Sequence, residues 1–257
     1  MVDQAKERAR TVVKISDFSS IKEKLSSFSF RSTTTKAIAI ALGLMTFQRL
    51  SGVSAVVYYT VDIFRGAGTS IPPTTATIIV GVVSVIASAT SACLVDRVGR
   101  RFLLIMSDAV MAISLAVMGI YFVYKDSGMN MQGVGWLPVV VICIFISIFR
   151  AGLGPIPWFM MAEVLPIEVK SWATSAVVCY TWICTFLITR LFLVVVDAIG
   201  FANTYLLMSS VATVGLFFIL YCVPETKNKS PQEIREIISG EYKVRYRKMR
   251  GYEFNDG

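Results

Sequence analysis

Six apolar stretches of about twenty residues dominate this sequence and limit what it can fold into. A helix of about 20 apolar residues crosses the roughly 30 Å hydrocarbon core of a membrane, whereas buried strands of soluble proteins run to only about 4–8 residues. Hydrophobic residues make up 55% of the chain, above the roughly 45–50% of soluble domains. The sequence therefore predicts an all-α integral membrane protein with six transmembrane helices, over Ala37–Tyr59, Ala76–Val95, Phe102–Val123, Trp136–Met160, Trp172–Val195 and Asn203–Val223.

The basic residues are divided unequally between the two sides of these predicted helices. Of the 25 Lys and Arg residues, eight precede the first apolar stretch, three follow the second, one follows the fourth and eight follow the sixth. Only Arg65, Lys125 and Arg190 lie on the opposite side. Cytoplasmic loops are enriched in Lys and Arg, so we expect both termini in the cytoplasm. Basic tails can also bind nucleic acid, but beside a membrane bundle they more often lie over anionic lipid. We therefore expect a lipid bilayer and no nucleic acid as partner.

The polar segments divide the chain into a cytoplasmic leader, a six-span bundle and a cytoplasmic tail, with bounds at 1–36, 37–224 and 225–257. In the tail, Ser230 and Glu233 have the spacing of a capping box at the start of a helix. Ile234, Ile237 and Ile238 then share one face of a short amphipathic helix, which we expect against the bundle or the membrane surface.

The composition points away from catalysis and from bound metals. The chain contains no histidine, the commonest metal ligand. Its five cysteines all fall within apolar stretches and their number is odd, which indicates small packing residues and not a disulfide framework. Nothing resembles a catalytic constellation. We therefore predict that the protein is not an enzyme and has no cofactor and no metal site.

The stretch "GLGPIPWFMMAEVLPIEVK", from Gly152 to Lys170, interrupts the fourth apolar run with two glycines and two prolines. Proline removes a backbone donor and clashes with the preceding turn of a helix. Carbonyls freed inside a membrane need partners or a water-lined cavity, and broken helices of this kind mark substrate paths in transporters. Trp158 follows the break and could stack on a sugar ring. Alternatively, the break is a kink that serves only helix packing, and Trp158 anchors the helix at the membrane–water interface.

A short joint, "DRVGRR" over Asp96–Arg101, links the second and third stretches. Its charges can pair with Glu163, Glu168 and Glu225, which are expected on the same side of the membrane. Such pairs could hold one conformation of a rocking transporter. Alternatively, the joint is only a topology signal.

The combination of motifs resembles the sugar porter branch of the major facilitator superfamily. The family shows Q-Q-x-S-G-x-N-x-x-x-Y-Y, D-R-x-G-R-R, G-P-x-P-W with E-x-x-P-x-x-x-R, and P-E-T-K/Q-G. Here "FQRLSGVSAVVYYT", "DRVGRR", "GLGPIPWFMMAEVLPIEVK" and "PETK" occur in that order. Within the family, the sequence around these motifs is most similar to that of the insect facilitated trehalose transporters. Animal facilitative glucose transporters are the next nearest group.

The resemblance covers roughly residues 37 to 240 and matches only the C-terminal half of the family, spans seven to twelve. It implies half of a transporter bundle in the plasma membrane, with the N-terminal six-span half as a missing partner. In this superfamily the substrate lies between two halves that rock around it. One half supplies one wall of the site.

The resemblance also implies which residues contact a sugar. Gln48 matches the first glutamine of the family motif, Arg49 replaces the second, and Ser54 replaces the asparagine. The family's N-W-x-x-N reads Thr181-Trp182-Ile183-Cys184-Thr185 here, so hydroxyls replace both amides and offer fewer hydrogen bonds. The predicted substrate-binding residues are Gln48, Arg49, Ser54, Ser84, Trp158, Thr181 and Thr185. The predicted gating residues are Tyr58, Tyr59, Pro155 and Pro157, and the predicted cytoplasmic salt-bridge latch comprises Asp96, Arg97, Arg100, Arg101, Glu163, Lys170 and Glu225.

Two arginines, Arg49 and Arg150, lie well inside apolar stretches, whereas Arg190 lies near the outer end of the fifth. A charge near the middle of a membrane costs about 2.5–3.5 kcal/mol on insertion scales, so it normally faces a cavity or a partner. No acid that could pair with them is expected within the predicted spans. Arg49 is expected to face the cavity, with a partner from the missing half or the substrate.

Three functions follow from these observations. The first is transport of a neutral sugar, trehalose or glucose, by alternating access as the C-terminal half of a carrier. The second is a truncated, transport-inactive fragment or regulator of a full carrier. The third, motivated by Arg49 and Arg150, is a carrier of an anionic solute.

Overall fold

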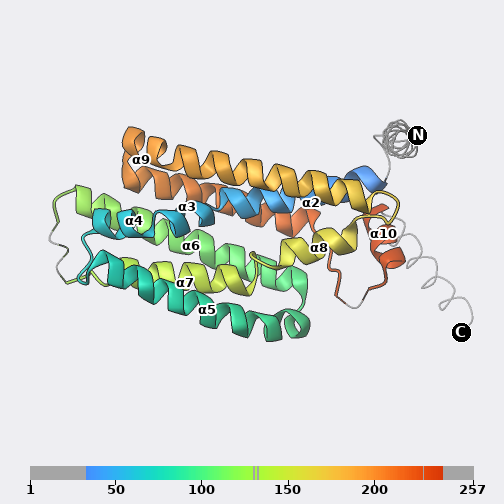
Figure 1. Ribbon diagram of the computed structural model, residues 1–257, viewed down its shortest axis with the longest axis horizontal. Coiled ribbons are helices and arrows are strands. Elements are labelled where there is room, and N and C mark those ends of the chain that lie inside the picture. The colour runs from blue at the N-terminus through green and yellow to red at the C-terminus, as the bar shows by residue number, and fades with distance from the viewer. Residues whose placement is uncertain (1–32, 130, 132, 228, 240–257) are drawn as a thin grey trace, which may run out of the picture.

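The computed structural model describes residues 33–129, 131, 133–227 and 229–239, and these residues form helices with no β-strand. Figure 1 shows the helices running roughly parallel and antiparallel along one long axis. The all-α prediction is confirmed over this part of the chain. The helices are α2 (Thr33–Leu50), α3 (Val53–Tyr58), α4 (Thr60–Ala67), α5 (Pro73–Val98), α6 (Arg100–Asp126), α7 (Leu137–Ala151), α8 (Ile156–Val164), α9 (Lys170–Cys222) and α10 (Pro231–Ser239).

Over the described residues, five helical stretches are long and apolar enough to cross a membrane, and one of them holds two of the six predicted spans. This is α9, which has 53 residues, about 80 Å if straight and therefore far longer than one crossing. The chain reverses at Gly200, where φ is 81° and ψ is 164°, a conformation that favours glycine. Figure 1 shows the two antiparallel arms. The other spans are Thr33–Tyr58, Pro73–Ser91, Arg100–Asp126 and Leu137–Val164.

Two spans contain breaks, as the sequence predicts. Gly52 has φ 77° and separates α2 from α3, and Ser51 helps to close the last turn of α2 by donating a 2.8 Å hydrogen bond to the carbonyl of Gln48. The fourth span divides at Gly152–Pro155 into α7 and α8. Each break puts irregular backbone at membrane depth, where protein or a cavity must satisfy it.

The core lies where α6 packs between α9 and α7. Phe122 of α6 stacks on Phe201 and Tyr205 of α9, with ring centroids 4.9 and 5.6 Å apart. The outward faces of α5 and of the first arm of α9 are apolar, and Val85 and Phe186 are 71% and 67% exposed. Lipid tails are as apolar as these side chains, so such exposure suits a membrane-embedded surface.

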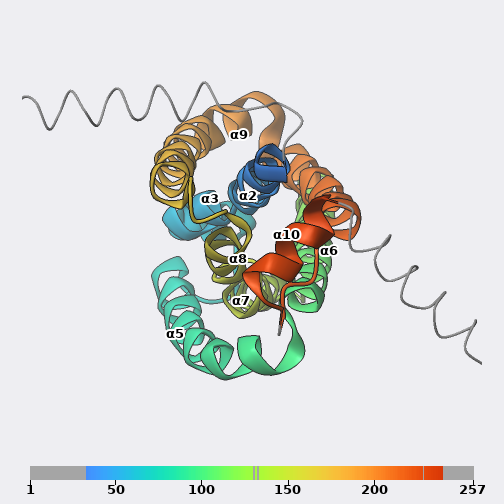
Figure 2. The same ribbon diagram turned by 90° about the vertical axis from the view of Figure 1, so that its right-hand side faces the viewer.

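The predicted capping box is confirmed at the start of α10. The backbone N–H of Ser230 donates to Glu233 Oε2 at 2.7 Å, and the N–H of Glu233 donates to Ser230 Oγ at 3.3 Å. Ile234 is buried, and Ile238 packs against the main core. Figure 2 shows α10 lying across one end of the bundle. Of the two predicted positions for this helix, the bundle is the one observed.

Candidate functional site

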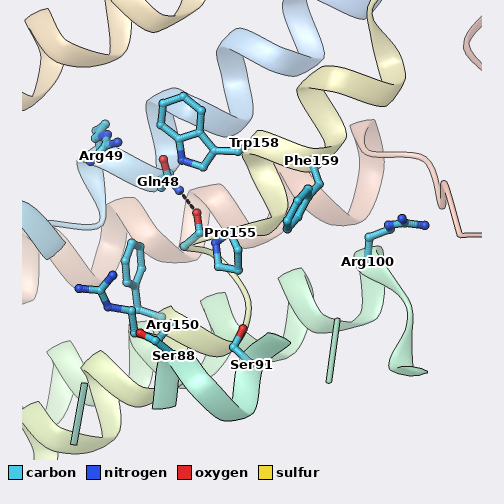
Figure 3. A pocket seen from close by; sticks show the side chains of 11 residues that line it. Gln48, Arg49, Ser88, Ser91, Arg100, Arg150, Pro155, Trp158 and Phe159 are labelled. Atoms are coloured by element: carbon cyan, nitrogen blue, oxygen red, sulfur yellow. Dashed lines mark hydrogen bonds between the residues drawn. The ribbon is translucent and has the colours of Figure 1, made fainter. Parts of the chain in front are cut away.

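A cavity of about 670 Å³ opens beside the break between α7 and α8. Figure 3 shows α2, α5 and the α7–α8 segment contributing its side chains. This volume lies within the roughly 300–1,000 Å³ of small-molecule sites. The lining residues are Gln48, Arg49, Ser88, Ser91, Arg100, Phe149, Arg150, Gly154, Pro155, Trp158 and Phe159.

Gln48 ties α2 to the helix break. Its side-chain Nε2 donates hydrogen bonds of 2.7 Å to the carbonyl oxygens of Leu153 and Gly154, as Figure 3 shows in part. The side chain is buried, and its Oε1 has no hydrogen-bond partner among the described residues. The amide thus satisfies backbone carbonyls that the break leaves free, and its Oε1 is buried in the cavity wall.

The two intramembrane arginines both line this cavity, from α2 and from α7. Arg150 donates from Nε to Ser84 Oγ at 3.1 Å. Arg49 Nε is buried and has no hydrogen-bond partner in the described part of the chain. Arg100, the third arginine of the lining, is paired with Glu163, which is not itself a lining residue. The lining therefore carries positive charge, and none of its described residues is acidic.

The predicted substrate-binding residues do not all reach this cavity. Gln48, Arg49 and Trp158 line it. Ser84 is not a lining residue, but its hydroxyl accepts a hydrogen bond from the lining residue Arg150. Ser54 is buried in α3 and is not part of the lining. Thr181 and Thr185 are also buried, and their hydroxyls donate to the carbonyls of Val177 and Thr181, one turn back, at 2.7 and 2.9 Å.

The predicted gating residues separate into two places. Tyr58 and Tyr59 line a second hollow of about 340 Å³, together with Thr185 and Arg190. Tyr59 donates from its hydroxyl to the carbonyl of Thr189 at 3.1 Å and stacks on Phe192, with centroids 5.4 Å apart. Pro155 lines the main cavity, whereas Pro157 is buried behind it. Their roles in gating stay predictions.

Part of the predicted latch forms contacts. Arg100 Nη2 lies 2.8 Å from Glu163 Oε1, joining α6 to α8. Glu225 accepts from the backbone N–H groups of Arg101 and Lys227 at 3.2 and 2.9 Å, which places a carboxylate at the N-terminus of α6. The Arg101 guanidinium donates to the carbonyl of Leu220.

For the other three predicted latch residues, the structure describes no ion pair. Lys170 is exposed at the first residue of α9, and no ion pair to it occurs among the described residues. The side chains of Asp96 and Arg97 lie outside the described residues.

Sequence reasoning missed several cavity residues. Ser88 and Ser91 lie four and seven residues after Ser84 on α5, so the three share one helical face, and this spacing could have revealed them. Phe149 and Phe159 flank the break and line the cavity. Aromatic residues in an apolar run carry no comparable signal.

The expectation that no acid lies within the spans is wrong. Asp108 of α6 is 1% exposed, and its Oδ2 has no hydrogen-bond partner among the described residues. A Cβ on Gly215 would lie 3.2 Å from that oxygen. Asp108 and the adjacent Ser107 are a short polar interruption in a long apolar run, and this spacing alone does not indicate a function. The cavity lining does not include Asp108, so it does not pair with the cavity arginines.

Three comparisons relate the chain to known proteins. Residues 2–238 match the family model described as "Sugar (and other) transporter". Over 205 residues the chain is 43% identical to the facilitated trehalose transporter Tret1 of Aedes aegypti and, separately, to that of Polypedilum vanderplanki. These alignments cover 80% of this chain but only 25% and 41% of the two relatives, so the chain spans less than half the length of each.

Solved structures with a similar fold include the proton:xylose symporter XylE bound to 6-bromo-6-deoxy-D-glucose. The two chains are 25% identical with a TM-score of 0.67, over 78% of this chain and 42% of the symporter. A crystal structure of a D-xylose-proton symporter has a TM-score of 0.69 over 86% of this chain and 50% of its own, at 24% identity. These similarities match the resemblance read from the sequence motifs.

Proposed function

Because the chain belongs to the sugar (and other) transporter family, we propose that it forms the C-terminal half of a carrier for a neutral sugar, trehalose or glucose. Transport then proceeds by alternating access, in which two six-span halves rock around a central site. The first two relatives described above are named as trehalose transporters. The 43% identity to them supports trehalose as the first sugar to test.

One observation carries this proposal: the cavity sits at the broken helix and combines polar groups with aromatic faces. Gln48 contributes an amide to the wall, and Ser88 and Ser91 contribute hydroxyls. Trp158 and Phe159 supply apolar faces against which a sugar ring can stack. A sugar needs both kinds of contact, because its hydroxyls require donors and acceptors while its C–H faces are apolar.

The missing wall of the site belongs to the N-terminal half of the carrier. In this arrangement 37–224 forms the transporter half, while 1–36 and 225–257 lie in the cytoplasm at the basic side of a plasma membrane protein. The pair Arg100–Glu163 and the Glu225 contacts lie at that end of the bundle. They hold α6, α8 and the end of α9 together in one conformation, and transport requires their release.

Uptake measurements test the proposal. The sequence upstream of Met1 in the transcript shows whether a six-span half is encoded in frame. The full-length product, or a fusion of this chain to the N-terminal half of the Polypedilum vanderplanki relative, is then expressed in a transport-null host. Saturable uptake of labelled trehalose or glucose is the expected result. Surface-expressed protein without saturable uptake of either sugar contradicts it.

The alternative to a carrier is a protein that does not itself transport, either an inactive fragment or a regulator of a full carrier. It is supported by the short coverage of the relatives, 25% and 41%. Co-expression of the 257-residue chain with an intact carrier separates the two functions. A regulator changes the uptake rate of the intact carrier, whereas a half-carrier needs its own N-terminal half and leaves an intact carrier unaffected.

The cavity charge favours a second substrate class, an anionic solute. Arg49 and Arg150 line the cavity and no acidic side chain does. Arg49→Gln removes one of these charges while keeping a hydrogen-bonding side chain. If the solute is anionic, this change lowers its uptake while sparing neutral sugars. Unchanged anion uptake in the variant rules the anionic substrate out.

A further inference from the structure

A separate groove opens at the end of the bundle where α10 crosses it. The groove has a volume of about 600 Å³ and lies between the start of α2, the end of α9 and α10. Figure 2, which looks onto this end, shows α2, α9 and α10 there. The ends of several membrane-spanning helices meet here, so the groove lies at the level of a lipid headgroup layer.

The walls of the groove are mostly apolar. Ile40 of α2, Phe218 of α9 and Ile238 of α10 are half-buried and form its sides. Phe218 is fixed in place by its contact with Phe47, with ring centroids 5.2 Å apart. Tyr221 also lines the groove and is 83% exposed. Tyrosine at a helix end is typical of the membrane–water interface, where its ring meets lipid and its hydroxyl meets water.

Among the described residues that line the groove, Lys36 and Arg101 are the charged ones. Lys36 is exposed one turn into α2. Arg101 at the start of α6 donates to the carbonyl of Leu220, and its Nε is buried with no hydrogen-bond partner among the described residues. Glu225 adjoins the lining residue Pro224 and already accepts from two backbone N–H groups. Glu236 adjoins the lining residue Ile237 on α10, and among the described residues the lining itself holds no carboxylate. The groove therefore presents positive charge beside an apolar wall.

We propose that this groove binds an anionic phospholipid, with the phosphate between Lys36 and Arg101 and part of one acyl chain along Ile40 and Phe218. Basic pockets between membrane helices on the cytoplasmic side bind anionic headgroups. The flanking segments 1–32 and 240–257 each carry more Lys and Arg than Asp and Glu, so their charge does not complement the groove. This site is distinct from the sugar cavity and does not depend on which solute is carried.

Photo-crosslinking in membranes tests the site. The full 257-residue chain is reconstituted with phosphatidylserine that carries a photoreactive group in its acyl chain, and adducts are mapped by peptide mass spectrometry. Adducts are expected on the α9 end and on α10. Unlabelled phosphatidylserine should compete, whereas phosphatidylcholine and soluble glycerophosphoserine should not.

Matched variants assign the headgroup contact. Lys36→Gln should weaken phosphatidylserine binding about fivefold, the effect of about 1 kcal/mol per basic residue near an anionic surface. Lys170→Gln is the control, because Lys170 is exposed near the same end but outside the groove. Ala39→Trp keeps both charges and fills the groove, so it should also reduce the adducts. Circular dichroism and thermal unfolding check that each variant is folded.

Four results would overturn the proposal. These are equal adducts with phosphatidylcholine, competition by soluble glycerophosphoserine, equal effects of Lys36→Gln and Lys170→Gln, or adducts that map away from the groove. None of these results depends on transport activity, so failure here is distinguishable from failure of the proposed sugar transport.

Discussion

Gln48 Nε2 lies 2.7 Å from the carbonyl oxygen of Gly154 and joins α2 to the break between α7 and α8. The same nitrogen lies 2.7 Å from the carbonyl oxygen of Leu153. A side chain that the family resemblance assigns to the sugar is therefore also a structural support for the cavity wall. Substitutions at this position should affect stability as well as sugar binding.

Gln48→Leu should destabilise the protein, because it leaves two carbonyls of the break without a donor. Each unsatisfied buried group costs about 1–3 kcal/mol, and we expect a loss of about 2–4 kcal/mol in the free energy of unfolding. Resistance to unfolding in detergent measures it. Ser88→Ala is the control, since Ser88 donates only to Ser84 within its own helix. Equal stability of the two variants would contradict the supporting role.

Gly152→Ala should also be destabilising. An added Cβ would lie 2.4 Å from Ser107 Oγ and 2.7 Å from the carbonyl oxygen of Leu103, and the backbone oxygen cannot easily move away. Overpacking of this kind costs about 1–3 kcal/mol. Gly81→Ala is the matched control, because nothing lies within 4 Å of its added Cβ. Thermal unfolding should show a lower melting temperature only for the Gly152 variant.

The Arg100–Glu163 pair should contribute about 1 kcal/mol, near the upper end for partly exposed ion pairs. The two side chains are 22% and 29% exposed, so salt screens the pair only in part. A double-mutant cycle with Arg100→Gln and Glu163→Gln measures the coupling energy. Lys170→Gln should show no coupling to either change. A coupling energy of zero would remove this pair from the latch.

Asp108→Asn should leave stability unchanged or raise it. The carboxyl is buried without a hydrogen-bond partner among the described residues, and an uncompensated buried carboxylate is costly. Asparagine has nearly the same shape and carries no charge. Asp108→Leu should be destabilising, because Gly215 leaves little space beside the carboxyl. A large loss of stability in Asp108→Asn would show that the carboxylate has a partner in the complete carrier.

The start of α10 should be sensitive to acid. The hydrogen bond from the backbone N–H of Ser230, assisted by the Ser230 side chain and the charge of Lys229, lowers the pKa of Glu233. A carboxyl whose pKa is lower when folded stabilises the helix above its ordinary pKa, and this stabilisation is lost as pH falls through the lowered value. The protection factors of the α10 amides, which correct for the intrinsic pH dependence of hydrogen exchange, should therefore fall on acidification below the usual range of glutamate. Glu233→Gln should exchange faster at neutral pH and lose most of this pH dependence.

The fold was largely predictable because helix length and breaks follow from local chemistry. Apolar runs of membrane length mark the spans, and Gly152 and Pro155 mark the break whatever surrounds them. The chain reverses at Gly200 between the two predicted spans Trp172–Val195 and Asn203–Val223, but the sequence did not single out this glycine as the point of reversal.

The site was less predictable because it depends on which groups meet. The resemblance selected Gln48 and Trp158, which line the cavity, but could not reveal that the Gln48 amide bonds to the helix break. Thr181 and Thr185 have polar side chains in a suitable register, yet their hydroxyls donate to their own helix. Arg49 was expected to face the cavity and lines it, and Arg150, for which the sequence predicts no such position, lines it too.

The most direct test of the account is labelled trehalose uptake by the complete carrier with Trp158→Ala, compared with Trp136→Ala. Trp158 lines the cavity, whereas Trp136 is exposed at the far end of α7 and outside it. An aromatic contact is worth about 0.5–1.5 kcal/mol, so Trp158→Ala should lower kcat/KM by about two- to tenfold at equal surface expression. Trp136→Ala should stay near the parent value. Equal uptake by the two variants would contradict a sugar site at this cavity.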